Sequence, residues 1–162
     1  MQQLFEGVYM IEGDVGGRPL QLMYLRGPEA SILLDTGCAG DPERFILDQL
    51  RQAGGDPKQL TWIINTHSDL DHTGGNHQMK RHAPQALLAC GDADREACSG
   101  PAELMRLRYD AYREQDGMFY DGPGREHTIA QSGQPEPIQV TFSGGERIRL
   151  GPNWDLRVLA LP

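Results

Sequence analysis

The sequence predicts an α+β or α/β fold in which helices pack on one face of a mixed sheet. Three observations support this fold class. The chain opens with closely spaced apolar segments, it continues with strands that alternate with helices, and it contains no repeat or low-complexity tract. Segments in this order are typical of a sheet that is covered by helices. A chain of 162 residues is long enough for one such domain with one core.

The first third of the chain is predicted to contain three strands and one helix. The strands are expected at residues 8–11, 20–25 and 32–35. A helix then begins at Asp41-Pro42, with Asp41 as the cap and Pro42 at the first helical position. Its apolar stripe consists of Ile46, Leu50 and Ala53. Gly54-Gly55 is expected to end this helix.

Strands and helices alternate further along the chain. The next elements are a strand at 62–66, a helix at 75–82 and a strand at 86–90. A short helix at 92–98, a longer helix at 101–115 and a loop at 116–137 that is rich in Gly, Pro and Gln are then expected. The last strands are expected at 138–142, 147–150 and 154–161. Gly144-Gly145 would form a hairpin turn.

Four side chains that can bind a metal ion lie within six positions, directly after the strand at 62–66. They are two imidazoles and two carboxylates, from His67, Asp69, Asp71 and His72. A tight loop after a strand can aim two pairs of ligands at two neighbouring points, because successive side chains of extended chain point to opposite sides. We expect His67 and Asp69 to converge on one point, and Asp71 and His72 on the other. The alternative is a polar loop that caps the next helix and contacts water.

Two segments resemble those of a known family. Residues 66–76, with the sequence THSDLDHTGGN, resemble the first metal-binding motif of the metallo-β-lactamase-fold superfamily, which is usually written HxHxDH. Residues 31–37, with the sequence SILLDTG, resemble the LLDTG strand end of the same superfamily. The resemblance covers essentially the whole chain. It implies an αβ/βα sandwich, in which two stacked halves hold the metal ions at the rim where their sheets meet.

The resemblance also implies a function. The expected activity is hydrolysis by a metal-activated water at a site for two zinc ions. His67 and Asp69 would hold the first ion, and Asp71 and His72 the second; Asp71 would also be the catalytic residue that holds or deprotonates the water. Asp35, at the end of the strand before the loop, would orient a ligand imidazole or the loop backbone through a hydrogen bond. Alternatively, Asp35 is a turn residue that accepts backbone hydrogen bonds before Gly37. The substrate stays open between a thioester, a lactone, a β-lactam and a phosphoester.

Position 69 departs from the motif, because this chain has Asp where the superfamily usually has His. A carboxylate is a harder ligand than an imidazole, so iron or manganese is possible beside zinc. An iron-type oxidoreductase of the same fold is therefore one alternative function. A binding module whose metal sites have degenerated is another.

The end of the chain indicates a boundary. In the superfamily, a strand like 154–161 runs into a PGHT-like turn that carries the next histidine ligand, and this chain ends at Pro162. We therefore expect residues 1–162 to be the N-terminal portion of the domain, truncated before the second ligand motif and poorly active alone. The helix-loop segment at about 92–137 would be an insertion that overhangs the site, with His127 and residues 118–120 as candidates for lining the pocket; for His127 a solvated loop position is the simpler interpretation.

Composition limits the classes of partner and compartment. The formal net charge of −8 argues against a broad nucleic-acid-binding face, so the expected partner is a small-molecule substrate. No apolar run is long enough to span a bilayer, and the N-terminus lacks the pattern of a signal peptide. Three cysteines without a zinc-binding spacing agree with a cytoplasmic protein. Cys38 is expected near the metal loop or as a small buried thiol. An apolar sheet face on 20–25, 32–35, 62–66 and 154–161 would promote self-association.

Overall fold

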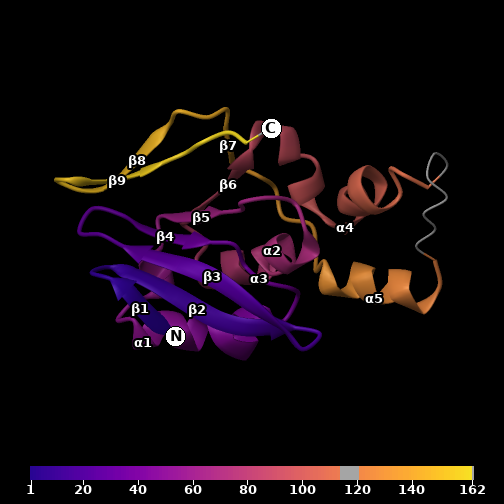
Figure 1. The fold of residues 1–162 in the computed structure, drawn as a ribbon, viewed down its shortest axis with the longest axis horizontal. Helices are drawn as coiled ribbons and strands as arrows, with labels where there is room; N and C mark the ends of the chain where they lie inside the picture. The colour runs from indigo at the N-terminus through magenta and orange to yellow at the C-terminus, as the bar shows by residue number, and fades with distance from the viewer. Residues whose placement is uncertain (114–120, 162) are drawn as a thin grey trace.

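A seven-stranded mixed sheet forms the centre of the computed structural model, which describes residues 1–113 and 121–161 (Figure 1). The strands lie side by side in the order in which they occur in the chain. They are β1 (Gln2–Phe5), β2 (Val8–Val15), β3 (Arg18–Arg26), β4 (Ser31–Leu34), β5 (Trp62–Ile64), β6 (Leu87–Gly91) and β7 (Val140–Phe142). β1 to β4 pair antiparallel, and β4 to β7 pair parallel. The β-rich start and the later alternation predicted from the sequence are therefore confirmed.

Helices connect the parallel strands, because two parallel neighbours require a crossover connection. The α-helices are α1 (Leu47–Gln52), α2 (Leu70–Thr73), α3 (Asn76–His82), α4 (Pro101–Leu104) and α5 (Pro123–Gln131). Wider π-helical turns precede α1 at Pro42–Ile46 and follow α4 at Met105–Tyr109. Short 3-10 turns occur at Pro57–Gln59, Asp92–Asp94 and Ala97–Ser99. Within the described residues, no helix is long and apolar enough to cross a membrane.

The main core lies between the sheet and the helices α1 and α3. From the sheet it contains Ile11, Leu22, Leu33, Ile63 and Leu88. From the helical layer it contains the predicted stripe of Ile46, Leu50 and Ala53, together with Met79. Each of these side chains is buried. The predicted mixed sheet with helices on one face is thereby confirmed, and the burial of this apolar surface stabilises the layer that carries the loop after β5.

The opposite face of the sheet packs against a hairpin of β8 (Arg147–Gly151) and β9 (Trp154–Arg157), which forms a separate two-stranded sheet (Figure 1). Ile148 and Leu150 from the hairpin form a second core with Leu25, Ile32 and Ile64 of the sheet. Trp62, Trp154 and Leu156 at the margin of this core are only partly buried. The apolar sheet face expected from the sequence is thus partly covered by the chain itself, and self-association stays a prediction.

Several local predictions were wrong. β1 was not predicted. Gly144-Gly145 is not a hairpin turn, because the strand before it pairs with β6 and β8 pairs with β9. Asp41 does not cap the following helix; its backbone is helical, and its carboxylate accepts a 2.9 Å hydrogen bond from the N–H of Cys38, which lies before it in the chain.

The segment between β6 and β7 also differs from the prediction. The helix expected at 101–115 is regular only to Tyr109, and part of its range lies outside the described residues. The loop expected at 116–137 contains α5, which begins at Pro123 after the left-handed Gly122. α5 contacts α2 directly, so it lies beside the loop that carries the candidate ligands.

Candidate metal site

The candidate ligands lie at the carboxyl edge of the parallel strands β4 and β5. Because these strands run in the same direction, Asp35 after β4 and Thr66 after β5 emerge at the same edge. The backbone N–H of Asp35 donates to the carbonyl of Ile64 at 2.9 Å and extends the pairing to this point. The chain then turns through His67 and Ser68 into α2, which begins at Leu70. The sheet thus fixes where the loop begins.

Buried polar side chains fix where the loop ends. Thr36 Oγ1 and Asn65 Nδ2 both donate to the backbone carbonyl of His72, at 3.1 and 2.9 Å. Thr36 Oγ1 also lies 2.9 Å from Asn76 Oδ1, and Asn76 Nδ2 donates to Asn65 Oδ1 at 2.9 Å. Both asparagine residues are 2% exposed. Since buried amides are costly to leave without partners, this network holds α2 and α3 against the ends of two strands.

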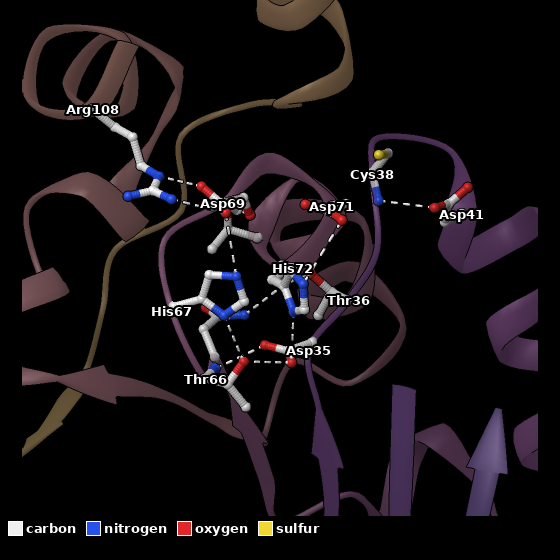
Figure 2. A network of polar contacts seen from close by, with 12 residues as sticks. Asp35, Thr36, Cys38, Asp41, Thr66, His67, Asp69, Asp71, His72 and Arg108 are labelled. Carbon is white, nitrogen blue, oxygen red and sulfur yellow. Dashed lines mark hydrogen bonds and ion pairs between the residues drawn. The ribbon is translucent and has the colours of Figure 1, made fainter. Parts of the chain in front are cut away.

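Asp35 connects the strand ends to both histidine residues (Figure 2). Its backbone adopts a left-handed conformation, with φ of 64°, and its side chain is buried. Oδ1 accepts a hydrogen bond from the Thr66 N–H, and Oδ2 accepts one from the Thr66 hydroxyl, each at 2.8 Å. The same Oδ2 lies 2.9 Å from His72 Nδ1, although this approach does not have the angle of a hydrogen bond. The hydrogen bond from the Thr66 N–H crosses to the neighbouring strand, unlike the local turn contact that the alternative requires.

The hydrogen bonds of Thr66 determine the protonation of His67. A hydroxyl has one hydrogen, and that of Thr66 is donated to Asp35. Thr66 Oγ1 also lies 3.0 Å from His67 Nδ1, so in this contact the ring nitrogen must be the donor. In a neutral imidazole the other nitrogen, Nε2, then has the free lone pair. Of the two ring nitrogens of His67, Nε2 is therefore the candidate donor to a cation.

His72 has a similar orientation, because its Nδ1 faces the Asp35 carboxylate at 2.9 Å, although without the angle of a hydrogen bond. The Nε2 atoms of the two rings face carboxylates of the loop. His67 Nε2 lies 3.4 Å from Asp69 Oδ2, and His72 Nε2 lies 3.8 Å from Asp71 Oδ2. The two ring centroids are 3.9 Å apart. Asp69 thus lies beside His67 and Asp71 beside His72, and their role as metal ligands stays a prediction.

Two donors per pair do not complete a metal site. Across 1–113 and 121–161, no three His, Cys, Asp or Glu side chains lie close enough together to hold a metal ion. The donor types fit a divalent cation, because imidazole nitrogen and carboxylate oxygen are both ligands of zinc. Each pair therefore has suitable chemistry and needs at least one more ligand to hold an ion.

Asp69 has a second partner that the sequence did not indicate. Arg108, in the π-helical turn after α4, contacts both carboxylate oxygens of Asp69, with Nε against Oδ1 and with Nη2 3.0 Å from Oδ2 (Figure 2). The hydrogen bond to Asp69 raises the pKa of Arg108. The carboxylate of Asp69 makes no capping hydrogen bond to α2, so the capping alternative does not apply to it. A separation of 39 residues in the chain left no local pattern that could predict this pair.

The neighbouring carboxylates raise the pKa of both the histidine and the nearest thiol, whereas burial acts on the two groups in opposite directions. Burial alone would lower the pKa of His72, but Asp35, and then Asp71 and Asp69, raise it above its ordinary value. Burial, followed by the charges of Asp41 and Asp71, raises the pKa of Cys38 to about 12. Cys38 is therefore a protonated thiol at neutral pH.

A cavity of about 540 Å³ lies beside the loop, between the β2–β3 turn and α5. Cys38, Leu70 and His127 all line it, and the side chain of His127, the pocket candidate that falls on described residues, is exposed. Residues 118–120, the other candidate, lie outside the described residues. A volume of this size is typical of a small-molecule site.

A comparison with family models identifies the family. The model of the Metallo-beta-lactamase superfamily matches residues 16–155. The chain belongs to this superfamily. Hydroxyacylglutathione hydrolase from Synechococcus sp. (strain JA-3-3Ab) is 32% identical over 140 residues, which are 79% of this chain and 54% of that protein. The protein of the same name from Cyanothece sp. (strain PCC 7425 / ATCC 29141) is 33% identical over 105 residues, which are 62% and 38% of the two chains. The chain thus spans about half the length, or less, of these curated relatives.

Solved structures of the superfamily share the fold. A metallo-beta-lactamase family protein from Thermus thermophilus superposes with a TM-score of 0.70 at 19% identity, over 97% of this chain and 52% of that protein. BJP-1, a subclass B3 metallo-beta-lactamase of Bradyrhizobium japonicum, has a TM-score of 0.69 at 21% identity, over 99% of this chain and 51% of that protein. At these identities the likeness shows the fold and leaves the substrate undecided.

Proposed function

We propose that this chain carries the first ligand loop of a metal-dependent hydrolase that cleaves thioesters. The observation that carries the proposal is the orientation of the two imidazoles. The Asp35 carboxylate lies 2.9 Å from His72 Nδ1 and is linked to His67 through Thr66, and both Nε2 atoms are turned toward the carboxylates of the loop. Histidine ligands are commonly oriented by a carboxylate in this way, through the ring nitrogen that does not bind the metal.

Zinc is the metal that we propose, held by His67, His72 and Asp71 together with further ligands. A bound zinc ion would act as a Lewis acid and would lower the pKa of a coordinated water. The chain's own contribution is to hold the donors. The loop is fixed by the backbone hydrogen bond that joins the ends of β4 and β5 and by the buried Asn65–Asn76 network. The imidazoles therefore do not need to reorganise when a cation binds.

Asp71 is the residue that we propose to orient the water or accept its proton. Its side chain is 34% exposed, so solvent and substrate can reach the carboxylate. The residue before it, Leu70, lines the cavity beside the loop. A carboxylate within reach of the attacking water is the group that general base catalysis requires.

The thioester is proposed because of the relatives. The two curated relatives described above are both named hydroxyacylglutathione hydrolase, and both are more than 30% identical to this chain over the matched region. The lactone, β-lactam and phosphoester alternatives have no comparable support. The iron-type oxidoreductase was suggested by the carboxylate at position 69, and in the structure Arg108 occupies that carboxylate.

The test is hydrolysis of a hydroxyacyl thioester of glutathione by the zinc-loaded chain. The reaction is monitored at high protein concentration through the decrease in thioester absorbance. We expect low turnover that Asp71→Asn reduces by at least about 100-fold. Asp48→Asn is the control, because Asp48 is an exposed carboxylate on α1. Equal rates for wild type and Asp71→Asn would exclude the proposed role. Elemental analysis separates the alternatives: stoichiometric iron favours the oxidoreductase, and no metal favours a binding module.

A further inference from the structure

The contact between Arg108 and Asp69 joins the segment 101–113 to the candidate loop. Both oxygens of the carboxylate face the guanidinium, with Nε on one and Nη2 on the other. This two-point geometry is the strongest form of carboxylate–arginine pair, because the planar donors of arginine match the two oxygens. The Asp69 side chain is 28% exposed and that of Arg108 is 52% exposed, so the pair is partly shielded from water.

The pair accounts for the residue type at position 69. In the superfamily motif this position is usually a histidine, and an imidazole could not accept two hydrogen bonds from one guanidinium. A carboxylate can, and here both of its oxygens are engaged. A cation that bound Asp69 would have to displace Arg108 or share the oxygens with a neighbouring positive charge, which repels it.

The pair is also linked to the ring of His67. Asp69 Oδ2, the oxygen that contacts Arg108 Nη2, lies 3.4 Å from His67 Nε2. From His67 the contacts continue through Thr66 to Asp35 and His72. Figure 2 shows this continuous series of side chains from the turn after α4 to the end of β4. These contacts connect the segment 101–113 to the loop beside the proposed ligands.

We propose that Asp69 is the anchor of the segment 101–113 and not a metal ligand, and that Arg108 is a positioning residue that holds this segment over the loop. That Asp69 is not a metal ligand rests on the proposed function, whereas its role as an anchor concerns the metal-free chain. The assignment of Asp69 as an anchor differs from the prediction made from the sequence, in which Asp69 is a ligand of the first ion. The ligands at the loop are then His67, Asp71 and His72.

The anchor is tested by a double-mutant cycle in the metal-free chain. The variants are Asp69→Asn, Arg108→Gln and the two combined, and hydrogen exchange of residues 101–113 is the measurement. We expect each single variant to raise exchange by about threefold to tenfold, and the double variant to raise it no further, because both changes remove one interaction. The charge-reversed pair Asp69→Arg with Arg108→Asp should restore protection. Additive effects, or no effect, would overturn the anchor.

Arg106→Gln is the matched control. Arg106 lies two residues earlier on the same turn, is 56% exposed, and pairs with Glu96 and Glu103 rather than with the loop. The same experiment reports the exchange of the Asp69 loop, which Arg108→Gln should raise and Arg106→Gln should leave unchanged. Faster exchange of the loop in Arg106→Gln than in Arg108→Gln would overturn a specific role for Arg108.

Zinc titration of the same variants tests the other half of the proposal, that Asp69 is not a metal ligand. The zinc Kd should stay within about fivefold of wild type in Asp69→Asn and in Arg108→Gln, because each change removes a partly exposed ion pair and no ligand. If Asp69→Asn weakened binding at least tenfold while Arg108→Gln strengthened it, Asp69 would be a ligand that Arg108 competes for, and the proposal would be overturned. A wild-type chain without zinc affinity would overturn the proposed function, and the exchange cycle alone would then decide the anchor.

Discussion

Asp35 accepts two hydrogen bonds of 2.8 Å from Thr66, one from the backbone N–H and one from the hydroxyl. The first joins the end of β4 to the chain that follows β5. The second uses the only hydroxyl hydrogen of Thr66. In the contact between Thr66 Oγ1 and His67 Nδ1, the ring nitrogen therefore has to be the donor. One buried carboxylate thus sets the position of the loop and the tautomer of its first histidine.

The first prediction concerns this carboxylate. Asp35→Asn keeps the size of the side chain, and asparagine tolerates the left-handed backbone that position 35 requires. It removes one acceptor oxygen, so Thr66 and His72 lose their common partner. We expect zinc affinity to fall about 10-fold to 100-fold, as is typical when a residue that orients a ligand is replaced. Calorimetric titration measures this, with the exposed Asp48→Asn as control. Unchanged affinity in Asp35→Asn would show that the imidazoles do not depend on this residue.

The buried amide pair gives the second prediction. Asn76→Ala removes the partner of Asn65 and Thr36 in a region that water does not reach. The unpaired groups should lower the free energy of unfolding by about 1–3 kcal/mol. Urea unfolding monitored by circular dichroism is the measurement. Gln52→Ala, an exposed position at the end of α1, should change it by less than about 0.5 kcal/mol. A similar small change in Asn76→Ala would mean that the network contributes little to stability.

The third prediction follows from the raised pKa of Cys38. The thiolate is the form that reacts with alkylating reagents, and a pKa of about 12 keeps Cys38 protonated up to strongly alkaline pH. At pH 8.5 we expect alkylation roughly 1,000-fold slower than that of an ordinary thiol, and a rate that still rises between about pH 8 and pH 10. Mass spectrometry of the peptide that contains Cys38 measures it, with the urea-unfolded chain as control. A rate that levels off near pH 8.5 in the folded chain would show that the thiol titrates normally.

Self-association is the fourth prediction. Several apolar side chains remain in contact with water: Phe5 is 74% exposed and Leu159 is 66% exposed, while Trp62 and Trp154 are partly buried. Exposed apolar groups of this kind favour association in water. We expect light scattering at micromolar concentration to report a mass above 18.0 kDa, and Leu159→Ser to reduce it. A wild-type chain that scatters as a monomer at every concentration would rule this out.

Local patterns in the sequence were sufficient for the strands β2 to β7 and for the position of the candidate loop. The run before Asp35 and the run before His67 are apolar and bounded by polar residues or glycine, so strand ends and ligands could be placed together. α5 could not be predicted, because Gly122, Pro123 and Gly124 look like a loop. That helix is held by a contact that is remote in the chain, in which Arg125 donates to Asp110 at 2.8 Å.

Position 69 illustrates the same limit at the site. An aspartate two residues after His67 has the spacing of a ligand, and spacing alone cannot show that another segment supplies its partner. Arg108 became visible only when the fold placed the turn after α4 beside the loop. The predicted helix cap at Asp41 was wrong for a related reason. A carboxylate before proline resembles a helix cap, but the carboxylate of Asp41 accepts a hydrogen bond from the backbone N–H of Cys38, which precedes it in the chain.

The orientation of the two imidazoles is tested most sharply by the ¹⁵N NMR spectrum of the histidine rings during a zinc titration of the chain. We expect both His67 and His72 to be protonated at Nδ1 at about pH 8, and their Nε2 resonances to shift when zinc is added. His77 and His82, which contact Glu136 and Glu43 away from the loop, are internal controls that should not shift. Rings protonated at Nε2, or a zinc response confined to the control histidines, would contradict the proposed role of the loop.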